Sequence, residues 1–159
     1  MNSTIKPNWI NINPWYISGF TGGEGSFTFS VSPGRINKDG EQKWIITTTF
    51  ALVAAYNTAN MLQFEQIRKI FGIGRIKIQN KRGNRKASLY FIVESLKDCI
   101  IISNYLKKYP LLSTKLIHFN IWSQVLELKN INDHLNEEGL NKIVTLKIHS
   151  PKGISDKLK

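Results

Sequence analysis

The stretch from residue 17 to residue 27, ISGFTGGEGSF, concentrates the residues that could do chemistry. Gly19 and Gly23 lie four positions apart, and Ser18 and Gly22 lie on the adjoining face, so in a helix they would let a second helix backbone approach closely. Each glycine inside a helix costs about 1 kcal/mol relative to alanine, which calls for a compensating contact. We therefore predict a helix–helix interface between two subunits at Ser18, Gly19, Gly22 and Gly23.

Glu24 follows directly, at the expected C-terminal end of this helix. The helix dipole disfavours a negative charge there unless a cation is present, and Mg²⁺ prefers oxygen ligands. If two such helices pair about a twofold axis, both Glu24 carboxylates could hold Mg²⁺ next to a phosphodiester. An ordinary glycine-rich helix end with an exposed glutamate has the same local pattern, so these residues leave both interpretations open.

The chain as a whole is strongly basic, with 22 Lys and Arg against 11 Asp and Glu, a net charge of +11 and a pI near 9.8. A polyanion would offset this self-repulsion, which makes nucleic acid the expected partner. Neither a basic amphipathic helix nor a long apolar span is seen, so no membrane partner is expected. The single Cys99 lies in an apolar run, which predicts a buried thiol rather than a disulfide or zinc site.

The composition also bears on where the protein is made. Residues 1–13 have neither an apolar signal core nor an Arg-rich amphipathic pattern, so no import or secretion signal is expected. The abundance of Ile, Asn and Lys is typical of an AT-rich gene, as in an organellar genome. We therefore expect a mitochondrial, organelle-encoded protein.

The elements that position these residues can be predicted from periodicity and from capping and turn residues. We expect a single domain over residues 1–159. Helix patterns occur at residues 14–23, 57–71, 95–109, 113–129 and 136–149. Strand patterns occur at residues 26–31, 44–53, 74–79 and 87–93, with a turn region marked by Pro33-Gly34 and Asp39-Gly40. This order predicts an α+β fold with one four-stranded antiparallel sheet and helices on one face.

The other face of that sheet is expected to be polar and basic. By alternation it presents Thr28, Ser30, Ser32, Thr47, Lys77, Gln79, Ser88 and Tyr90, and the loop of the second hairpin adds Lys81, Arg82, Arg85 and Lys86. A solvated antiparallel sheet has this pattern as well. The net charge favours a nucleic-acid-binding surface, since a two-stranded ribbon fits the major groove of B-DNA.

These segments together resemble the LAGLIDADG homing endonuclease family. Residues 17–25 align with the motif that names the family. Residues 13–15 ahead of it, and residues 71–76, 108–115 and 134–140 after it, resemble further segments in the family's order and spacing. The resemblance is to single-motif chains and to the first half of two-motif fungal mitochondrial members. It implies an αββαββα unit, two of which grip DNA with their sheets and cut both strands with Mg²⁺ or Mn²⁺.

The resemblance also implies roles for individual residues. Glu24 matches the metal-binding acid of the family, and the Gly23 carbonyl matches a further metal ligand. Lys115 corresponds to a basic residue near the reacting phosphate. Lys77 falls at another basic position of the catalytic pocket, which can equally be a groove contact. We therefore expect Glu24, Lys115 and Lys77 to form the catalytic site.

The chain departs from the family pattern at Gly22, where an acidic residue is common, and at Ala54, where a glutamine often orients a water. Three functions are open. The first is a homodimeric, site-specific double-strand DNA endonuclease. The second is a member without cleavage that binds structured RNA, as an intron maturase or ribosome-associated protein. The third is one half of a split nuclease, paired with a different chain. Ala54 favours the second and third, whereas Glu24 and Lys115 favour the first, which we expect.

Overall fold

The computed structural model describes residues 12–80, 83 and 86–150. In chain order the elements are α1 (Pro14–Glu24), β1 (Gly25–Ile36), β2 (Gln42–Ala55), α2 (Thr58–Phe71), β3 (Arg75–Gln79), β4 (Ser88–Val93), α3 (Leu96–Lys108), α4 (Thr114–Asn130), a short 3-10 helix η2 (Asp133–Leu135) and α5 (Glu137–Ile148). The αββαββα order predicted from the sequence is confirmed, and so are the two further helices predicted after it, which are α4 and α5.

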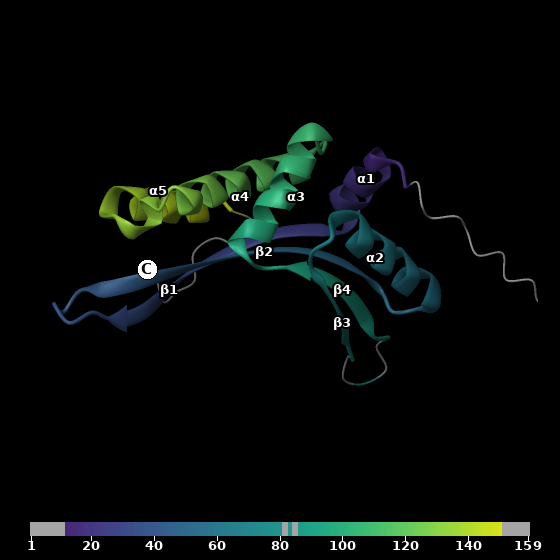
Figure 1. Ribbon diagram of the computed structural model, residues 1–159, viewed down its shortest axis with the longest axis horizontal. Helices are drawn as coiled ribbons and strands as arrows, with labels where there is room; N and C mark the ends of the chain where they lie inside the picture. The colour runs from purple at the N-terminus through teal and green to yellow at the C-terminus, as the bar shows by residue number, and fades with distance from the viewer. Residues whose placement is uncertain (1–11, 81–82, 84–85, 151–159) are drawn as a thin grey trace, which may run out of the picture.

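The strands form one antiparallel sheet in the order β1-β2-β4-β3. Figure 1 shows the helices gathered on one side of this sheet, with the opposite side uncovered. The predicted α+β class and the four-stranded sheet with one free face are therefore confirmed. We call the uncovered side the open face and the other side the covered face.

The first hairpin is longer than predicted, because Pro33 and Gly34 lie inside β1 rather than in a turn. Pro33 pairs with Trp44, and the register shifts between Pro33 and Ile36. Since β1 is an edge strand, a proline that lacks an N–H leaves no partner strand unsatisfied. The turn follows at Asn37, whose side-chain oxygen accepts from the N–H groups of Asp39 and Glu41 at 3.0 and 2.8 Å.

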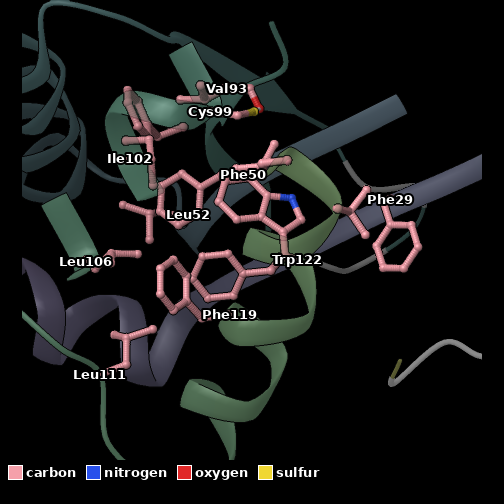
Figure 2. Close-up of a cluster of buried hydrophobic side chains, with 14 of the residues drawn as sticks. Phe29, Phe50, Leu52, Val93, Cys99, Ile102, Leu106, Leu111, Phe119 and Trp122 are labelled. Carbon is pink, nitrogen blue, oxygen red and sulfur yellow. The ribbon is translucent and has the colours of Figure 1, made fainter. Parts of the chain in front are cut away.

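The covered face carries the hydrophobic core, which Figure 2 shows around Trp122 and Phe50. Phe27 of β1 contacts both of these rings as well as Phe119 of α4, with ring centroids 5.2–5.4 Å apart. Cys99 is fully buried in the same cluster, as predicted, and burial raises the pKa of its thiol to about 11. The thiol is thus part of the packing that holds the sheet against α3 and α4.

Candidate functional site

Glu24 is the last residue of α1 and its side chain is exposed. The helix starts as predicted, because the Asn13 side chain accepts from the Trp15 N–H at 2.9 Å and Pro14 follows as the first helical residue. At its end the Gly25 N–H donates to the Thr21 carbonyl. A Cβ on Gly25 would lie 2.5 Å from that carbonyl oxygen, so only glycine lets α1 pass directly into β1.

Lys115 lies beside this helix end. Its ammonium, near the start of α4, donates a hydrogen bond to the Gly25 carbonyl, one residue beyond Glu24. The same ammonium lines a pocket of about 220 Å³ with His118, Ser26 and other residues. The structure thus places the Lys115 ammonium against the main chain one residue after Glu24, although the two residues are 91 positions apart in the sequence.

Gly19, Gly22 and Gly23 of α1 have no neighbour within the chain that requires glycine. A Cβ added at any of the three would meet nothing within 4 Å. Gly19 and Gly23 are exposed, and Trp15 on the same helix is 56% exposed. Three glycines that weaken the helix and face open space are consistent with the predicted approach of a second helix backbone.

Ser18 differs from the prediction. Only 4% of it is exposed, and its hydroxyl donates to the Tyr109 carbonyl at 2.7 Å. Its side chain therefore ties α1 to the segment after α3 instead of lying at the surface. A contact between aromatic rings supports the same junction, since Trp15 packs edge-on against Tyr109 at 5.5 Å. The candidate interface on α1 therefore consists of the glycines and Trp15.

The strand register places the predicted nucleic-acid-binding side chains on the open face. Three cross-strand pairs show this: Thr28 with Thr49, Ser30 with Thr47, and Lys77 with Tyr90. Ser30, Thr47, Lys77 and Gln79 are exposed, whereas Thr28, Ser32 and Tyr90 are half-buried. The Ser30 and Thr47 hydroxyls also bond to each other. The outer part of this face, on β1 and β2, is therefore lined mainly by short hydroxyl side chains.

Ser88 shares this face by register, opposite Gln79, but it is only 8% exposed. The prediction that Ser88 is available to a ligand is therefore not supported, because alternation gives the face of a side chain and not its exposure. Of the four basic residues predicted on the second hairpin loop, Lys86 is exposed. The other three, Lys81, Arg82 and Arg85, lie outside the described residues.

Lys77 is not close to Glu24. It lies on β3, the edge strand opposite β1, and three strand spacings of about 4.8 Å separate the two edges by roughly 14 Å. This position suits a groove contact better than a role at the scissile phosphate.

Ala54 pairs with Leu89 and packs against the core on the covered face. A glutamine at position 54 would therefore not project from the open face of this chain.

Two charged residues of the open face were missed in the sequence. Arg75 begins β3, and its Nη2 atom lies 2.8 Å from Oε2 of Glu94, which follows β4. Both side chains are exposed. Arg75 could have been recognised in the sequence, because it alternates with Lys77 and Gln79 and so belongs to the same face of the strand. Glu94 carried no signal, because its place beside Arg75 follows from the pairing of β3 with β4.

The described part of the chain contains no cluster of three or more His, Cys, Asp or Glu side chains that could hold a metal ion. One chain thus brings a single carboxylate, Glu24, to the end of α1. The Gly23 carbonyl, in the last helical turn, is a further hard oxygen that could serve as a metal ligand. In addition, none of the described helices is both long and apolar enough to span a bilayer.

The family model described as LAGLIDADG endonuclease matches residues 17–126. The chain is 34% identical over 158 residues, 99% of its length, to the "Probable intron-encoded endonuclease 3" of Neurospora crassa, and spans 27% of that protein. Among solved structures it resembles the I-SmaMI LAGLIDADG homing endonuclease bound to cleaved DNA, with a TM-score of 0.77 and 31% identity over 93% of this chain and 47% of that one. The homing endonuclease I-TnaI shares the fold, with a TM-score of 0.75 at 23% identity over 93% of this chain and 94% of that one.

These matches confirm the resemblance found in the sequence. The chain belongs to the LAGLIDADG endonuclease family. It spans about a quarter of the Neurospora crassa relative and about half of I-SmaMI.

Proposed function

We propose that this chain is one unit of a paired, divalent-metal-dependent homing endonuclease that cuts double-stranded DNA at a specific site. The observation that carries the proposal is the bond of the Lys115 ammonium to the Gly25 carbonyl, one residue after Glu24, at the end of a helix whose glycines face open space. Relatives named as intron-encoded endonucleases support it. Their intron origin, together with the Ile, Asn and Lys content, supports a mitochondrial, organelle-encoded gene.

Pairing supplies what one chain lacks. Two α1 helices that meet at Gly19 and Gly23 would bring two Glu24 carboxylates and two Gly23 carbonyls to one place. That oxygen-rich set fits Mg²⁺ or Mn²⁺, whereas a single exposed glutamate does not. I-SmaMI, a similar protein, was solved with an uncleaved DNA target in the presence of calcium ions.

Each side chain then has a distinct task. The chemistry that a divalent cation supplies in such a site is activation of a water and neutralisation of charge on the phosphate. Glu24 and the Gly23 carbonyl would hold it at the helix end. Lys115, fixed by its bond to Gly25, would place a positive charge next to the reacting phosphodiester, where charge builds up in the transition state.

The open face supplies the DNA surface. Its hydroxyls, Lys77 and Gln79 are donors and acceptors of the kind that meet base edges in the major groove. Lys77 is assigned here to groove contact rather than to catalysis, because it lies three strands away from β1. Lys81, Arg82, Arg85 and Lys86 are proposed to contact phosphates, since positive charge on a loop next to the groove positions a duplex without reading it.

A second candidate is pairing with a different LAGLIDADG unit. The observation that favours it is that the chain matches only 47% of the I-SmaMI chain, which leaves room for a second unit of equal size. The departures at Gly22 and Ala54 are compatible with this arrangement, because a non-identical partner would supply its own residues to the shared site. Identical and non-identical pairing use the same α1 surface and differ only in the partner.

The test is cleavage of a randomised double-stranded DNA library by the purified chain, with sequencing of the cut ends. Wild type should cut one class of sequence in Mg²⁺ or Mn²⁺. Glu24→Gln keeps the shape and removes the charge, so cleavage should fall by orders of magnitude while binding in Ca²⁺ survives. The control is Glu65→Gln, at an exposed glutamate of α2, which should cut normally.

The outcomes separate the alternatives. Cutting that appears only when a second LAGLIDADG chain is added would replace the homodimer with the split enzyme. Retention of structured RNA by a chain that leaves every DNA uncut would replace the nuclease with the RNA-binding function.

A further inference from the structure

Arg75 and Glu94 stand side by side on the open face, at the end of the β3–β4 hairpin opposite its loop. Nη2 of Arg75 lies 2.8 Å from Oε2 of Glu94, with more than half of each side chain exposed. A guanidinium carries five N–H donors in a rigid fork, so one bond to Glu94 leaves donors that can point outward. The exposed carboxylate likewise keeps acceptor positions. The pair therefore presents donors directly beside an acceptor.

No other long polar side chain shares the row of Arg75 on the open face. The cross-strand partners of that row are Ile92, Ala51 and Ser26, in the strand order from Arg75 towards β1. These side chains are short or apolar, so they neither bond to Arg75 nor extend as far from the sheet. Arg75 is therefore the one long polar side chain of this row that can reach a base edge, and Glu94, which directly follows β4, lies beside it.

One base pair matches this arrangement on both of its bases. In the major groove guanine offers two acceptors, N7 and O6, and its cytosine offers the N4 donor next to O6. O6 and N4 are joined by an N–H···O bond, so they lie about 2.9 Å apart. The donor Nη2 and the acceptor Oε2 are spaced almost the same, at 2.8 Å.

We propose that Arg75 and Glu94 together read a single G·C pair, with Arg75 on guanine and Glu94 accepting from cytosine N4. This proposal rests on the proposed DNA-binding function of the open face. T·A is the next best match, because it keeps the O4 acceptor and N6 donor in the same order but lacks the second acceptor that N7 supplies. A·T and C·G reverse the order and set acceptor against acceptor. The expected ranking is G·C, then T·A, then the other two.

Glu94 has a second effect in this arrangement. The bond to Glu94 restricts the rotamers of Arg75, which reduces the entropy lost when the guanidinium binds a base. A carboxylate so near to DNA would otherwise repel phosphates. Its position beside Arg75 offsets that repulsion and selects for a cytosine amino group.

The experiment is selection of bound sequences from a randomised duplex library in Ca²⁺, with wild type, Arg75→Gln and Glu94→Gln. Wild type should prefer a G·C pair at one position of the selected site. In Arg75→Gln the preference for G·C at that position should fall roughly 5- to 100-fold, which is the discrimination that a bidentate contact supplies. Glu94→Gln should weaken the preference at that same position. The rest of the selected site should be unchanged in both variants.

A matched control is available in the chain. Lys107 and Glu127 form an exposed ion pair of 2.9 Å between α3 and α4, on the helix side of the sheet. Lys107→Gln and Glu127→Gln remove the same charges away from the open face and should select the wild-type site. Exposed pairs add little to folding stability, so thermal unfolding should be nearly unchanged in all four variants.

The possible results are distinct. Unchanged selection by both Arg75→Gln and Glu94→Gln would overturn the proposal while leaving the DNA-binding function intact. A change in Arg75→Gln alone would overturn the role given to Glu94. Wild type that enriches no sequence would overturn the proposed function itself, and with it the reading of a G·C pair.

Discussion

The ammonium of Lys115 donates a hydrogen bond to the main-chain carbonyl of Gly25, 90 residues earlier in the chain. This bond holds a positive charge against the main chain one residue after Glu24, the last residue of α1, although Lys115 belongs to a different element. It also joins the start of α4 to the point where α1 becomes β1. The position of the positive group of the candidate site is thus set by a contact to the backbone.

Lys115→Met should separate binding from cutting. The substitution keeps an unbranched side chain of similar length and removes the charge, so single-turnover cleavage should fall on the order of 10²-fold or more. DNA binding in Ca²⁺ should change by less than tenfold. The control is Lys142→Met on α5, where the lysine pairs with Glu138 on the surface. Equal cleavage by the two variants would contradict a role of Lys115 at the phosphate.

Gly19→Leu should prevent pairing without unfolding the chain. No atom lies within 4 Å of a Cβ at this position, and leucine favours helix more than glycine by up to about 1 kcal/mol. Sedimentation should therefore give a monomer whose circular dichroism matches wild type. Asn104→Leu, at an exposed position of α3, serves as the control and should associate like wild type. A wild-type chain that stays monomeric at high concentration would contradict the homodimer.

Gly22 and Gly25 should respond in opposite ways to alanine. The Cβ of Gly25→Ala would lie 2.5 Å from the Thr21 carbonyl, so α1 must shift, at a cost of about 1–3 kcal/mol. Gly22→Ala meets nothing within the chain and should stabilise α1 by up to about 1 kcal/mol. Urea unfolding measures both, in the Gly19→Leu background so that association does not contribute. Similar changes in the free energy of unfolding for the two variants would show that the helix end does not require glycine at position 25.

Binding should weaken steeply with salt, since each phosphate neutralised on B-DNA contributes about 0.9 to the slope of log K against log salt. Changing Lys81, Arg82, Arg85 and Lys86 together to Gln should reduce that slope, by about 3.6 if each contacts one phosphate. The control changes four exposed helix lysines to Gln: Lys97, Lys107, Lys108 and Lys142. A smaller slope in the control than in the loop variant would place the duplex on the helix side instead.

Much of the fold could be predicted, because it depends on local patterns. The Asn13 cap with Pro14 marks the start of α1, and the alternation of Phe27, Phe29 and Val31 with polar residues marks the buried side of β1. The strand order could not be obtained this way. Pro33-Gly34 was misread as a turn, because a proline is tolerated in a strand only at an edge and the edge is known only from the sheet.

The candidate site was predicted as far as the family motif and alternation extend. Lys115 bonds to the main chain one residue after Glu24, and the strand register puts the predicted polar side chains of the strands on the open face. Helical spacing puts Ser18 at the surface of α1. The hydrogen bond that buries it could not be predicted, because its partner Tyr109 lies 91 residues away in the sequence. Glu94 was missed for the same kind of reason, since only the β3–β4 pairing puts it beside Arg75.

Gly19, Gly23 and Glu24 all belong to the short helix α1, so in the proposed homodimer the surface that joins two subunits and the group that binds the metal cannot be separated. Complete sites would then increase with the square of protein concentration when most chains are single. Halving the number of molecules in a compartment would leave about a quarter of the cutting capacity. The amount of protein would thus limit DNA cutting, without any inhibitor or covalent switch.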